Sequence, residues 1–389
     1  MTVVVQKFGG SSLADVERLG RVAERVVSTR RQGHDMVVVV SAMGKTTDGL
    51  LDLATKVAGA GEPARRELDM LVSTGERVSM ALLSIAVQTR GCDAISFTGS
   101  QCGIITNDRH FDARIIEVRP HRVEDELARG RIVIVAGYQG MSYKREITTL
   151  GRGGSDTTAV ALAAALRAER CEIYSDVDGV YAADPRAVPD ARHIAELDYA
   201  TLEEMASSGA KVLCAQAVEW ARRAGIAIYA RSTFAEEGRE TVVRQFGAGQ
   251  EPRVRAVTAD ARVALLEVDA AAREGVLETL AAKRIPIADC DWSEGGMLVT
   301  LSLTNAPDWP AARRALSGRI REDVARVSVV GVDLGDRAES VARFVRILSE
   351  ANAAPVALAS GPLRMSAVVH RDALEPAQRA LYAAFVDQG

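Results

Sequence analysis

The stretch VVVQKFGGSS at residues 3–12 runs directly into LADVERLGRVAERVVST at residues 13–29. Residues 3–8 are a short run rich in valine, as is typical of a buried strand. Residues 13–29 place apolar side chains at helical spacing: Leu13, Val16, Leu19, Val22, Ala23, Val26 and Val27. The chain therefore begins with a strand, a Gly-Gly turn and a helix, the unit from which helix-covered sheets are built.

The same alternation continues to about residue 233. Residues 36–43 are a continuous apolar run bounded by turn residues, as expected of a strand buried on both faces. Similar runs lie at 94–97, 132–137, 171–175 and 226–230, with helical stretches such as 157–168 and 212–224 between them. We predict an α/β fold, in which helices cover both faces of a mostly parallel sheet.

The pattern changes after Phe246-Gly247-Ala248-Gly249, which with Pro252 indicates a linker. Two rounds of the order β-α-β-β-α follow, beginning near residues 263 and 327. This order predicts two ferredoxin-like (βαββαβ) domains. We expect a catalytic α/β domain at 1–249 and two ferredoxin-like domains at 250–322 and 323–389.

Composition argues against several classes of protein. A formal net charge of -4 gives no support to a nucleic-acid partner. Five cysteines without a CxxC pair, together with five histidines, indicate neither a disulfide framework nor a zinc site. We expect no signal peptide, because a basic leader is missing, and no membrane partner, because the most apolar run is short. These features favour a cytoplasmic protein with reduced thiols.

Lys7-Phe8-Gly9-Gly10-Ser11-Ser12 is the first candidate phosphate-binding segment. Glycines let the backbone approach an anion closely, and the amides at a helix N-terminus point toward it. Lys7 would add a full positive charge. A tight turn beside an ordinary surface lysine explains the same residues, so both interpretations stay open.

The second candidate phosphate-binding segment is Gly151-Arg152-Gly153-Gly154-Ser155-Asp156. Ser155 or Asp156 could simply cap the following helix. Three glycines and an arginine are more than a cap requires, and the arginine fork matches a carboxylate or phosphate. This segment favours a functional interpretation.

Two further loops follow predicted strands, where open α/β sheets bind ligands. They are residues 41–47 (SAMGKTT) and residues 174–186 (YSDVDGVYAADPR). The aspartates of the second loop could hold Mg²⁺ or could form a local turn. Neither a GxxxxGK[ST] loop nor a GxGxxG fingerprint is present.

Taken together, these segments resemble the amino-acid kinase family, and within it the aspartate kinase branch. The resemblance covers about the first 233 residues and rests on seven segments in the family's order: KFGGSS (7–12), SAM (41–43) with Thr47, STGERVS (73–79), FTGSQ (97–101), TTLGRGGSDTTA (148–159), YSDVDGVYAADPR (174–186) and GAKVL (209–213). It implies transfer of the ATP γ-phosphate to the side-chain carboxylate of L-aspartate, giving 4-phospho-L-aspartate and ADP, the first step towards lysine, threonine and methionine.

The resemblance also implies residue roles. Contacts to ATP, which would enter with Mg²⁺, fall on Lys7, Gly9, Gly10, Ser11, Ser175, Asp176, Tyr181, Arg186 and Lys211. Contacts to aspartate fall on Ser41, Thr47, Glu76, Arg152 and Ser155, with Arg152 on the α-carboxylate and Glu76 on the α-ammonium. Lys7, Asp156 and Arg152 would lie closest to the reacting groups, and no direct metal ligand is assigned.

The C-terminal part resembles the paired ACT domains of aspartate kinases more loosely. Where effector-sensing members carry a glycine-containing turn, this chain has Ala270-Ala271-Ala272 in its first domain. We therefore expect weak or lost feedback regulation, and a homo-oligomer formed through these domains. A separately translated regulatory subunit, another carboxylate kinase and a non-catalytic amino-acid sensor remain alternatives.

Overall fold

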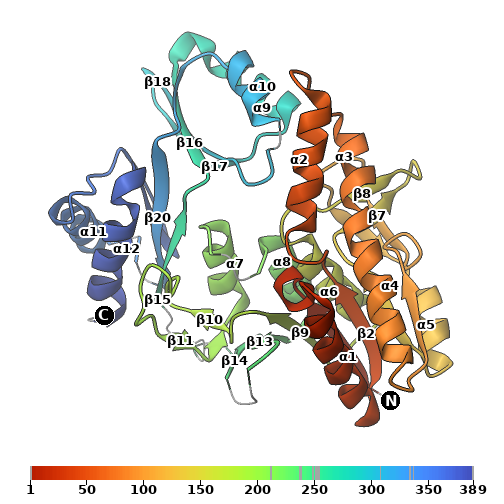
Figure 1. Cartoon of the computed structure of the whole chain (residues 1–389). Coiled ribbons are helices and arrows are strands. Elements are labelled where there is room, and N and C mark those ends of the chain that lie inside the picture. Colours follow the sequence, from red (N-terminus) through yellow and green to blue (C-terminus); the bar gives the residue numbers. More distant parts are fainter. Residues whose placement is uncertain are drawn as a thin grey trace. The chain divides into compact units, whose positions relative to one another are not determined.

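The computed structural model describes residues 2–210, 213–235, 239–247, 249, 255–306, 308–332, 334–335 and 337–387. The chain divides into two compact units, each of which is described by itself (Figure 1). Unit 1 comprises Met1–Val180, Ala195–Tyr199 and Leu213–Glu251. Unit 2 comprises Tyr181–Ile194, Ala200–Val212 and Pro252–Gly389.

An eight-stranded sheet forms the centre of unit 1, in the order β12-β14-β13-β9-β1-β2-β6-β3. The six strands from β13 to β3 are parallel to one another, and β14 is antiparallel to β13. The bounds are β1 Val3–Phe8, β2 Asp35–Val40, β3 Ala94–Phe97, β6 Ile132–Ala136, β9 Arg170–Ser175, β12 Glu196–Leu197, β13 Ile228–Ser232 and β14 Glu240–Val243. The valine-rich runs of β1 and β2 are buried because both have neighbours on each side and helices on both faces.

Helices cover the two faces of this sheet. On one face α1 lies beside α4 and packs over the side chains of Val4 and Phe8 (Figure 1). α6 contacts β1, β2 and β9. Because side chains alternate along a strand, Lys7 points to the opposite face from Phe8. The helices of unit 1 are η1 Gly10–Leu13, α1 Val16–Arg31, α2 Thr46–Ala58, α3 Arg65–Val72, α4 Thr74–Gln88, α5 His121–Ala128, α6 Gly154–Ala165 and α8 Ala215–Ala224.

A smaller four-stranded sheet, in the order β5-β4-β7-β8, completes unit 1. Its strands are β4 Ile104–Thr106, β5 Ile115–Val118, β7 Gln139–Ser142 and β8 Ile147–Thr149. The sequence pattern does not predict this sheet, because strands of three or four residues carry too little alternation to be recognised.

Unit 2 contains two four-stranded antiparallel sheets. One has the order β17-β18-β16-β19 and the other the order β15-β20-β22-β21. The elements of the first are β16 Val263–Asp269, η2 Ala270–Ala272, α9 Arg273–Lys283, β17 Ile287–Trp292, β18 Gly296–Ser302, α10 Trp309–Ala315 and β19 Arg319–Arg321. Those of the second are β15 Arg255–Asp260, β20 Val324–Gly331, α11 Ala338–Glu350, β21 Ala357–Gly361, β22 Arg364–His370, η3 Arg371–Ala373, α12 Leu374–Tyr382 and η4 Ala383–Asp387.

Each sheet therefore belongs to a ferredoxin-like module. The second module takes its fourth strand from β15, which precedes the first module in the chain and pairs with β20. Two short strands, β10 Val180–Tyr181 and β11 His193–Ile194, pair with each other. Unit 2 includes β10 from Tyr181 onward, β11, and α7 Tyr199–Ser207 from Ala200 onward.

The predicted fold class is confirmed, whereas two predicted boundaries are wrong. The strand predicted at 36–43 ends at Val40, and Ser41 begins a loop. The first α-helix begins at Val16 because the Asp15 carboxylate accepts the Arg18 N–H and caps it. The predicted domain limits at 249/250 and 322/323 stay predictions.

One helical stretch, Arg65–Gln88, is long and apolar enough to pass a test for a membrane span. It consists of α3 and α4 on either side of Ser73, and 44% of its most apolar 18-residue segment is buried. Core helices of soluble proteins pass the same test, so this stretch is weak evidence for a membrane protein.

We predict that Leu83→Ala destabilises the protein by about 2–5 kcal/mol, because Leu83 of α4 is fully buried against the sheet and its truncation leaves a cavity. The matched control is Leu53→Ala on α2, where the side chain is 55% exposed and the expected change is within about 0.5 kcal/mol. Urea unfolding followed by circular dichroism measures both. Equal effects of the two substitutions would contradict the assigned packing.

Candidate active site

Lys7 forms a buried ion pair at the end of β1. Its Nζ lies 2.6 Å from Oδ1 of Asp156, and the two side chains are only 11% and 10% exposed. Asp156 lies in the first turn of α6, the helix packed on the same face of the sheet. Ion pairing offsets part of the cost of removing both charges from water. The lysine is therefore held at the carboxyl end of the central strand, where α/β sheets bind ligands.

The turn after Lys7 brings two loops into close contact. A Cβ on Gly10 would lie 2.8 Å from the Ala42 carbonyl oxygen and 3.0 Å from that of Gly44, so a side chain there would clash with backbone. The Gly44 N–H also donates to the Gly10 carbonyl at 2.9 Å. This close approach explains the glycine and joins the Lys7 turn to the loop that carries Ser41.

The second glycine-rich loop has a left-handed backbone at Gly151 (φ 74°) and Gly153 (φ 75°). A Cβ on Gly153 would lie 2.5 Å from that of Cys214. Gly153 is the N-cap of α6, and no side chain caps the helix. The alternative that Ser155 or Asp156 serves as the cap is therefore wrong: both lie inside the first turn and are buried.

Glu76 is a buried carboxylate with one oxygen unsatisfied. It lies in the first turn of α4 and is 3% exposed. Its Oε1 accepts the Ala42 N–H at 3.1 Å, whereas Oε2 has no hydrogen-bond partner among the described residues. Burial raises the pKa of Glu76 to about 7, against smaller opposing effects of backbone hydrogen bonds. A cation placed beside Oε2 would relieve this cost.

The other predicted contacts in unit 1 lie near these groups in the chain. Ser41 follows β2 and is half-buried, as is Thr47 in the first turn of α2. Arg152 is exposed. Ser11, in η1, is half-buried, and its carbonyl accepts from Arg18.

The aspartate-rich loop begins with a local turn. The Ser175 Oγ accepts the Val177 N–H at 3.2 Å. Asp176 is exposed, and Asp178 lies 3.5 Å from Arg239. Among the described residues no group of three or more His, Cys, Asp or Glu side chains could hold a metal ion.

Two predicted nucleotide contacts belong to unit 2 and are described within it. The Tyr181 ring packs edge-on against His193, with centroids 5.4 Å apart. The exposed Arg186 guanidinium bonds to the Asp184 carboxylate, with Nη2 and Oδ2 2.8 Å apart. Lys211 lies outside the described residues.

The sequence motifs did not identify Tyr138, which follows β6 at the carboxyl end of the sheet. Burial raises the pKa of its phenol, and the nearby carboxylates of Glu76 and Asp69 raise it further, whereas Arg152 lowers it. Both proposed amino-acid contacts therefore act electrostatically on the Tyr138 phenol. Its position after a strand and between Gly137 and Gly140 is the signal that could have identified it.

Comparisons with known proteins agree with this geometry. The amino acid kinase family profile matches residues 2–232. The chain therefore belongs to the amino acid kinase family.

Relatives matched within this family are aspartokinases. The aspartokinase of Mycolicibacterium smegmatis is 56% identical over 238 residues, which are 61% of this chain and 56% of that protein. The chain thus matches little more than half the length of that relative. The aspartokinase of Corynebacterium glutamicum is 40% identical over 99% of this chain and 96% of its own length.

Solved structures show the same likeness. The structure of E. coli aspartokinase III in complex with aspartate and ADP is 26% identical, covers 98% of this chain and 99% of its own, and superposes with a TM-score of 0.84. A second structure, of E. coli aspartokinase III with lysine and aspartate, superposes with a TM-score of 0.71.

We predict that Glu76 titrates near pH 7 in the ligand-free protein, because burial penalises its charged form. Carboxyl-carbon NMR, with Glu76→Gln to assign the signal, measures the midpoint. A raised pKa also means that the folded state binds a proton that the unfolded state has lost. Raising the pH from about 5 to 7 should therefore lower the stability of the wild type relative to Glu76→Gln. A midpoint at the ordinary glutamate value, with parallel stability curves, would contradict this environment.

Proposed function

We propose that the chain is an ATP-dependent aspartate kinase, which transfers the γ-phosphate of ATP to the side-chain carboxylate of L-aspartate. The observation that carries the proposal is the combination, in one unit, of the buried Lys7–Asp156 pair with the unsatisfied Glu76 carboxylate. The first is suited to phosphoryl oxygens and the second to an α-ammonium group. Relatives named aspartokinase, and a structure with aspartate and ADP bound, support the same substrates.

The chemistry requires charge neutralisation rather than a base. A free aspartate side chain has a pKa of about 3.9, so the nucleophile is already ionised at neutral pH. Catalysis must bring this anion in line with the γ-phosphoryl group and stabilise the charge that spreads over its oxygens. Lys7, the amides of the Gly9-Gly10 turn and the Mg²⁺ that accompanies ATP as part of the substrate suit that task.

A second set of residues would recognise the amino acid. Glu76 in its ionised form would pair with the α-ammonium, and the Arg152 fork would take the α-carboxylate. Ser41, Thr47 and Ser155 offer hydroxyl groups nearby in the chain. The nucleotide would contact Ser11, Ser175 and Asp176 of unit 1 in addition to Lys7. The contacts implied for Tyr181, Arg186 and Lys211 stay predictions. The reaction and its small polar substrates fit a cytoplasmic enzyme of amino-acid biosynthesis.

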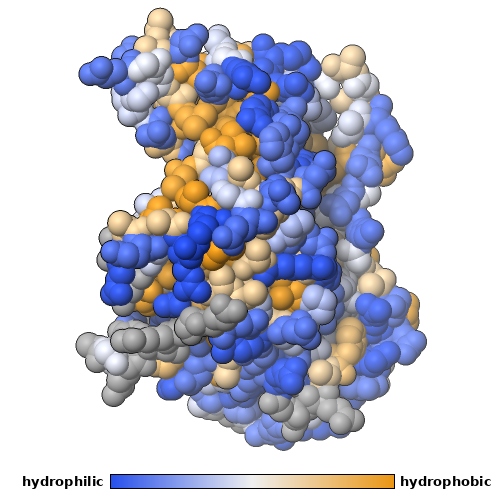
Figure 2. All heavy atoms as spheres, turned by 90° about the vertical axis from the view of Figure 1, so that its left-hand side faces the viewer, coloured by the Kyte–Doolittle hydropathy of each residue, from blue (hydrophilic) through white to orange (hydrophobic). Residues whose placement is uncertain are grey.

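Oligomerisation through unit 2 is part of the proposal. β17 and β21 are edge strands of their sheets, and Ile287, Trp292 and Leu358 on them are exposed. Figure 2 shows hydrophobic surface gathered between hydrophilic regions on the face that it presents. Exposed apolar edge strands are typical of surfaces that pair with another chain. A homo-oligomer accounts for them, and a separately translated regulatory subunit is the alternative.

We predict that the purified chain releases ADP from MgATP in the presence of L-aspartate, and that Lys7→Ala lowers the turnover by about a hundred-fold or more, because a preorganised charge is lost. The control is Lys56→Ala, an exposed lysine on α2. A coupled ADP assay measures both, with a panel of other carboxylate and phosphate acceptors.

Preference for another acceptor would identify a different kinase of the same family, and no turnover at all would favour an amino-acid sensor. Near-normal turnover of Lys7→Ala would remove the proposed role of Lys7.

Feedback control should be weak. The turn between β16 and α9 is the alanine segment η2, and the Arg273 guanidinium there donates to the carbonyls of Ala270, Ser293 and Glu294. It also lies over the Trp292 ring, 4.4 Å from the centroid. Arginine and alanine side chains thus occupy the turn where a small amino acid would need close access to backbone.

We predict that millimolar lysine, threonine or both inhibit the enzyme only weakly. A ligand that binds two conformations equally well does not shift the equilibrium between them. The same coupled assay and titration calorimetry measure inhibition and binding. Steep inhibition at low concentration, with a matching heat of binding, would overturn this interpretation.

A further inference from the structure

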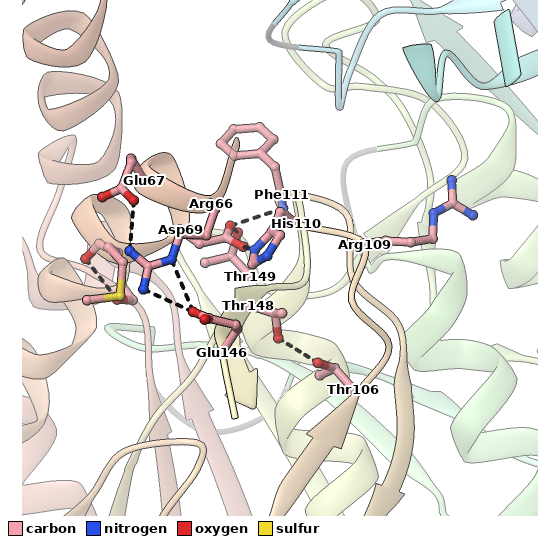
Figure 3. Close-up of polar contacts among 12 residues, drawn as sticks. Arg66, Glu67, Asp69, Thr106, Arg109, His110, Phe111, Glu146, Thr148 and Thr149 are labelled. Atoms are coloured by element: carbon pink, nitrogen blue, oxygen red, sulfur yellow. Dashed lines mark hydrogen bonds and ion pairs between the residues drawn. The ribbon is translucent and has the colours of Figure 1, made fainter. Parts of the chain in front are cut away.

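Asp69 of α3 is a fully buried carboxylate outside the set of predicted site residues. It accepts three hydrogen bonds (Figure 3): from the Phe111 N–H at 3.0 Å, from the Thr149 hydroxyl at 2.5 Å and from the His110 Nδ1 at 2.6 Å. The first two donors share Oδ1, and His110 binds Oδ2. Charge-assisted hydrogen bonds of this kind are about twice as strong as neutral ones, so Asp69 holds the residues that donate to it firmly in place.

Three segments meet at this carboxylate. His110 and Phe111 lie in the loop between β4 and β5, Thr149 is the last residue of β8, and Asp69 lies near the end of α3. The loop is further tied to β8, because the Ala113 N–H donates to the Thr149 carbonyl at 2.9 Å. Figure 3 shows the His110 and Thr149 side chains converging on Asp69.

Each of two segments continues directly into a proposed amino-acid contact. Thr149 is followed by Leu150 and Gly151, and then by Arg152. α3 passes through Ser73 into α4, whose first turn holds Glu76. The Ser73 carbonyl is itself fixed by the buried Gln139 amide at 2.9 Å. Asp69 therefore joins the strand that leads to Arg152 with the helix pair that leads to Glu76.

Tyr138 extends the cluster toward the same two residues. Burial raises the pKa of its phenol, and the Thr149 side chain opposes that effect. The Tyr138 carbonyl also accepts the Leu150 N–H at 2.9 Å, one residue into the Arg152 loop.

We propose that Asp69 is a positioning residue for the amino-acid substrate: through Thr149 it fixes the Arg152 loop relative to the α3–α4 pair, and so sets the spacing between the contacts for the α-carboxylate and the α-ammonium. The proposal rests on the aspartate kinase function above. It makes the Asp69 cluster a determinant of aspartate affinity, and it assigns the cluster no contact with ATP.

The decisive variants are at Thr149. Thr149→Val keeps the shape but removes the donor to Asp69, whereas Thr149→Ser keeps the hydroxyl. We expect Thr149→Val to raise the KM for aspartate about tenfold, the cost of one unsatisfied buried group, with the KM for MgATP within about twofold. Thr149→Ser should restore the wild-type value.

Asp69→Asn should act in the same direction, because an amide cannot accept from all three donors. The matched control is Glu126→Gln on α5, another buried carboxylate, which binds Arg129 and Arg131. It should lower stability without changing the ratio of the two KM values. The proposal would be overturned if Asp69→Asn or Thr149→Val raised the KM values for aspartate and MgATP equally, or raised neither of them.

Hydrogen–deuterium exchange separates this proposal from the proposed function. Thr149→Val should speed exchange in segments 73–79 and 150–156 together, with β2 unchanged. A wild-type chain without aspartate kinase activity would refute the function alone, while unchanged exchange in both segments would refute the positioning role of Asp69.

Discussion

The ion pair between Lys7 and Asp156 is the interaction on which the rest of the site depends. It connects the central strand of the sheet to the first turn of α6, and both partners are nearly buried. A lysine held only by its own backbone would sample many rotamers, and holding it still costs conformational entropy. The aspartate holds the ammonium in place before any ligand arrives, so the charge is preorganised where phosphoryl oxygens would need it.

Under the proposed function, repulsion between the two anionic substrates would account for the remaining features. ATP and a dicarboxylic amino acid can approach each other only where positive groups and backbone amides outweigh their charges. Glycines at positions 10 and 153 let the loops that carry these groups pack closely, because a Cβ there would meet the Ala42 and Gly44 carbonyls or Cys214. Burial raises the pKa of Glu76 to about 7, and a cation beside the carboxylate would favour its charged form, which fits the same logic.

The sequence predicted those parts of the molecule that depend on local pattern. Residues 3–8 form the predicted strand because valine runs have few alternatives to burial, and the glycine-rich segments lie at strand ends as expected. Residues 255–260 could not be assigned to the second module, because pairing of β15 with β20 joins strands separated by the whole first module. Asp69 and His110 are 41 residues apart, and no periodicity connects them. Tertiary contacts of this kind, together with the unsatisfied oxygen of Glu76, become visible only when the chain is folded.

The central claim is that a carboxylate receives the phosphoryl group, and trapping of the product tests it most directly. An acyl phosphate reacts with hydroxylamine to give a hydroxamate, whereas a phosphate ester does not. Wild-type chain incubated with MgATP, L-aspartate and hydroxylamine should form aspartyl hydroxamate in a one-to-one ratio to ADP, and none when aspartate is omitted. ADP released with aspartate but without hydroxamate would contradict the account.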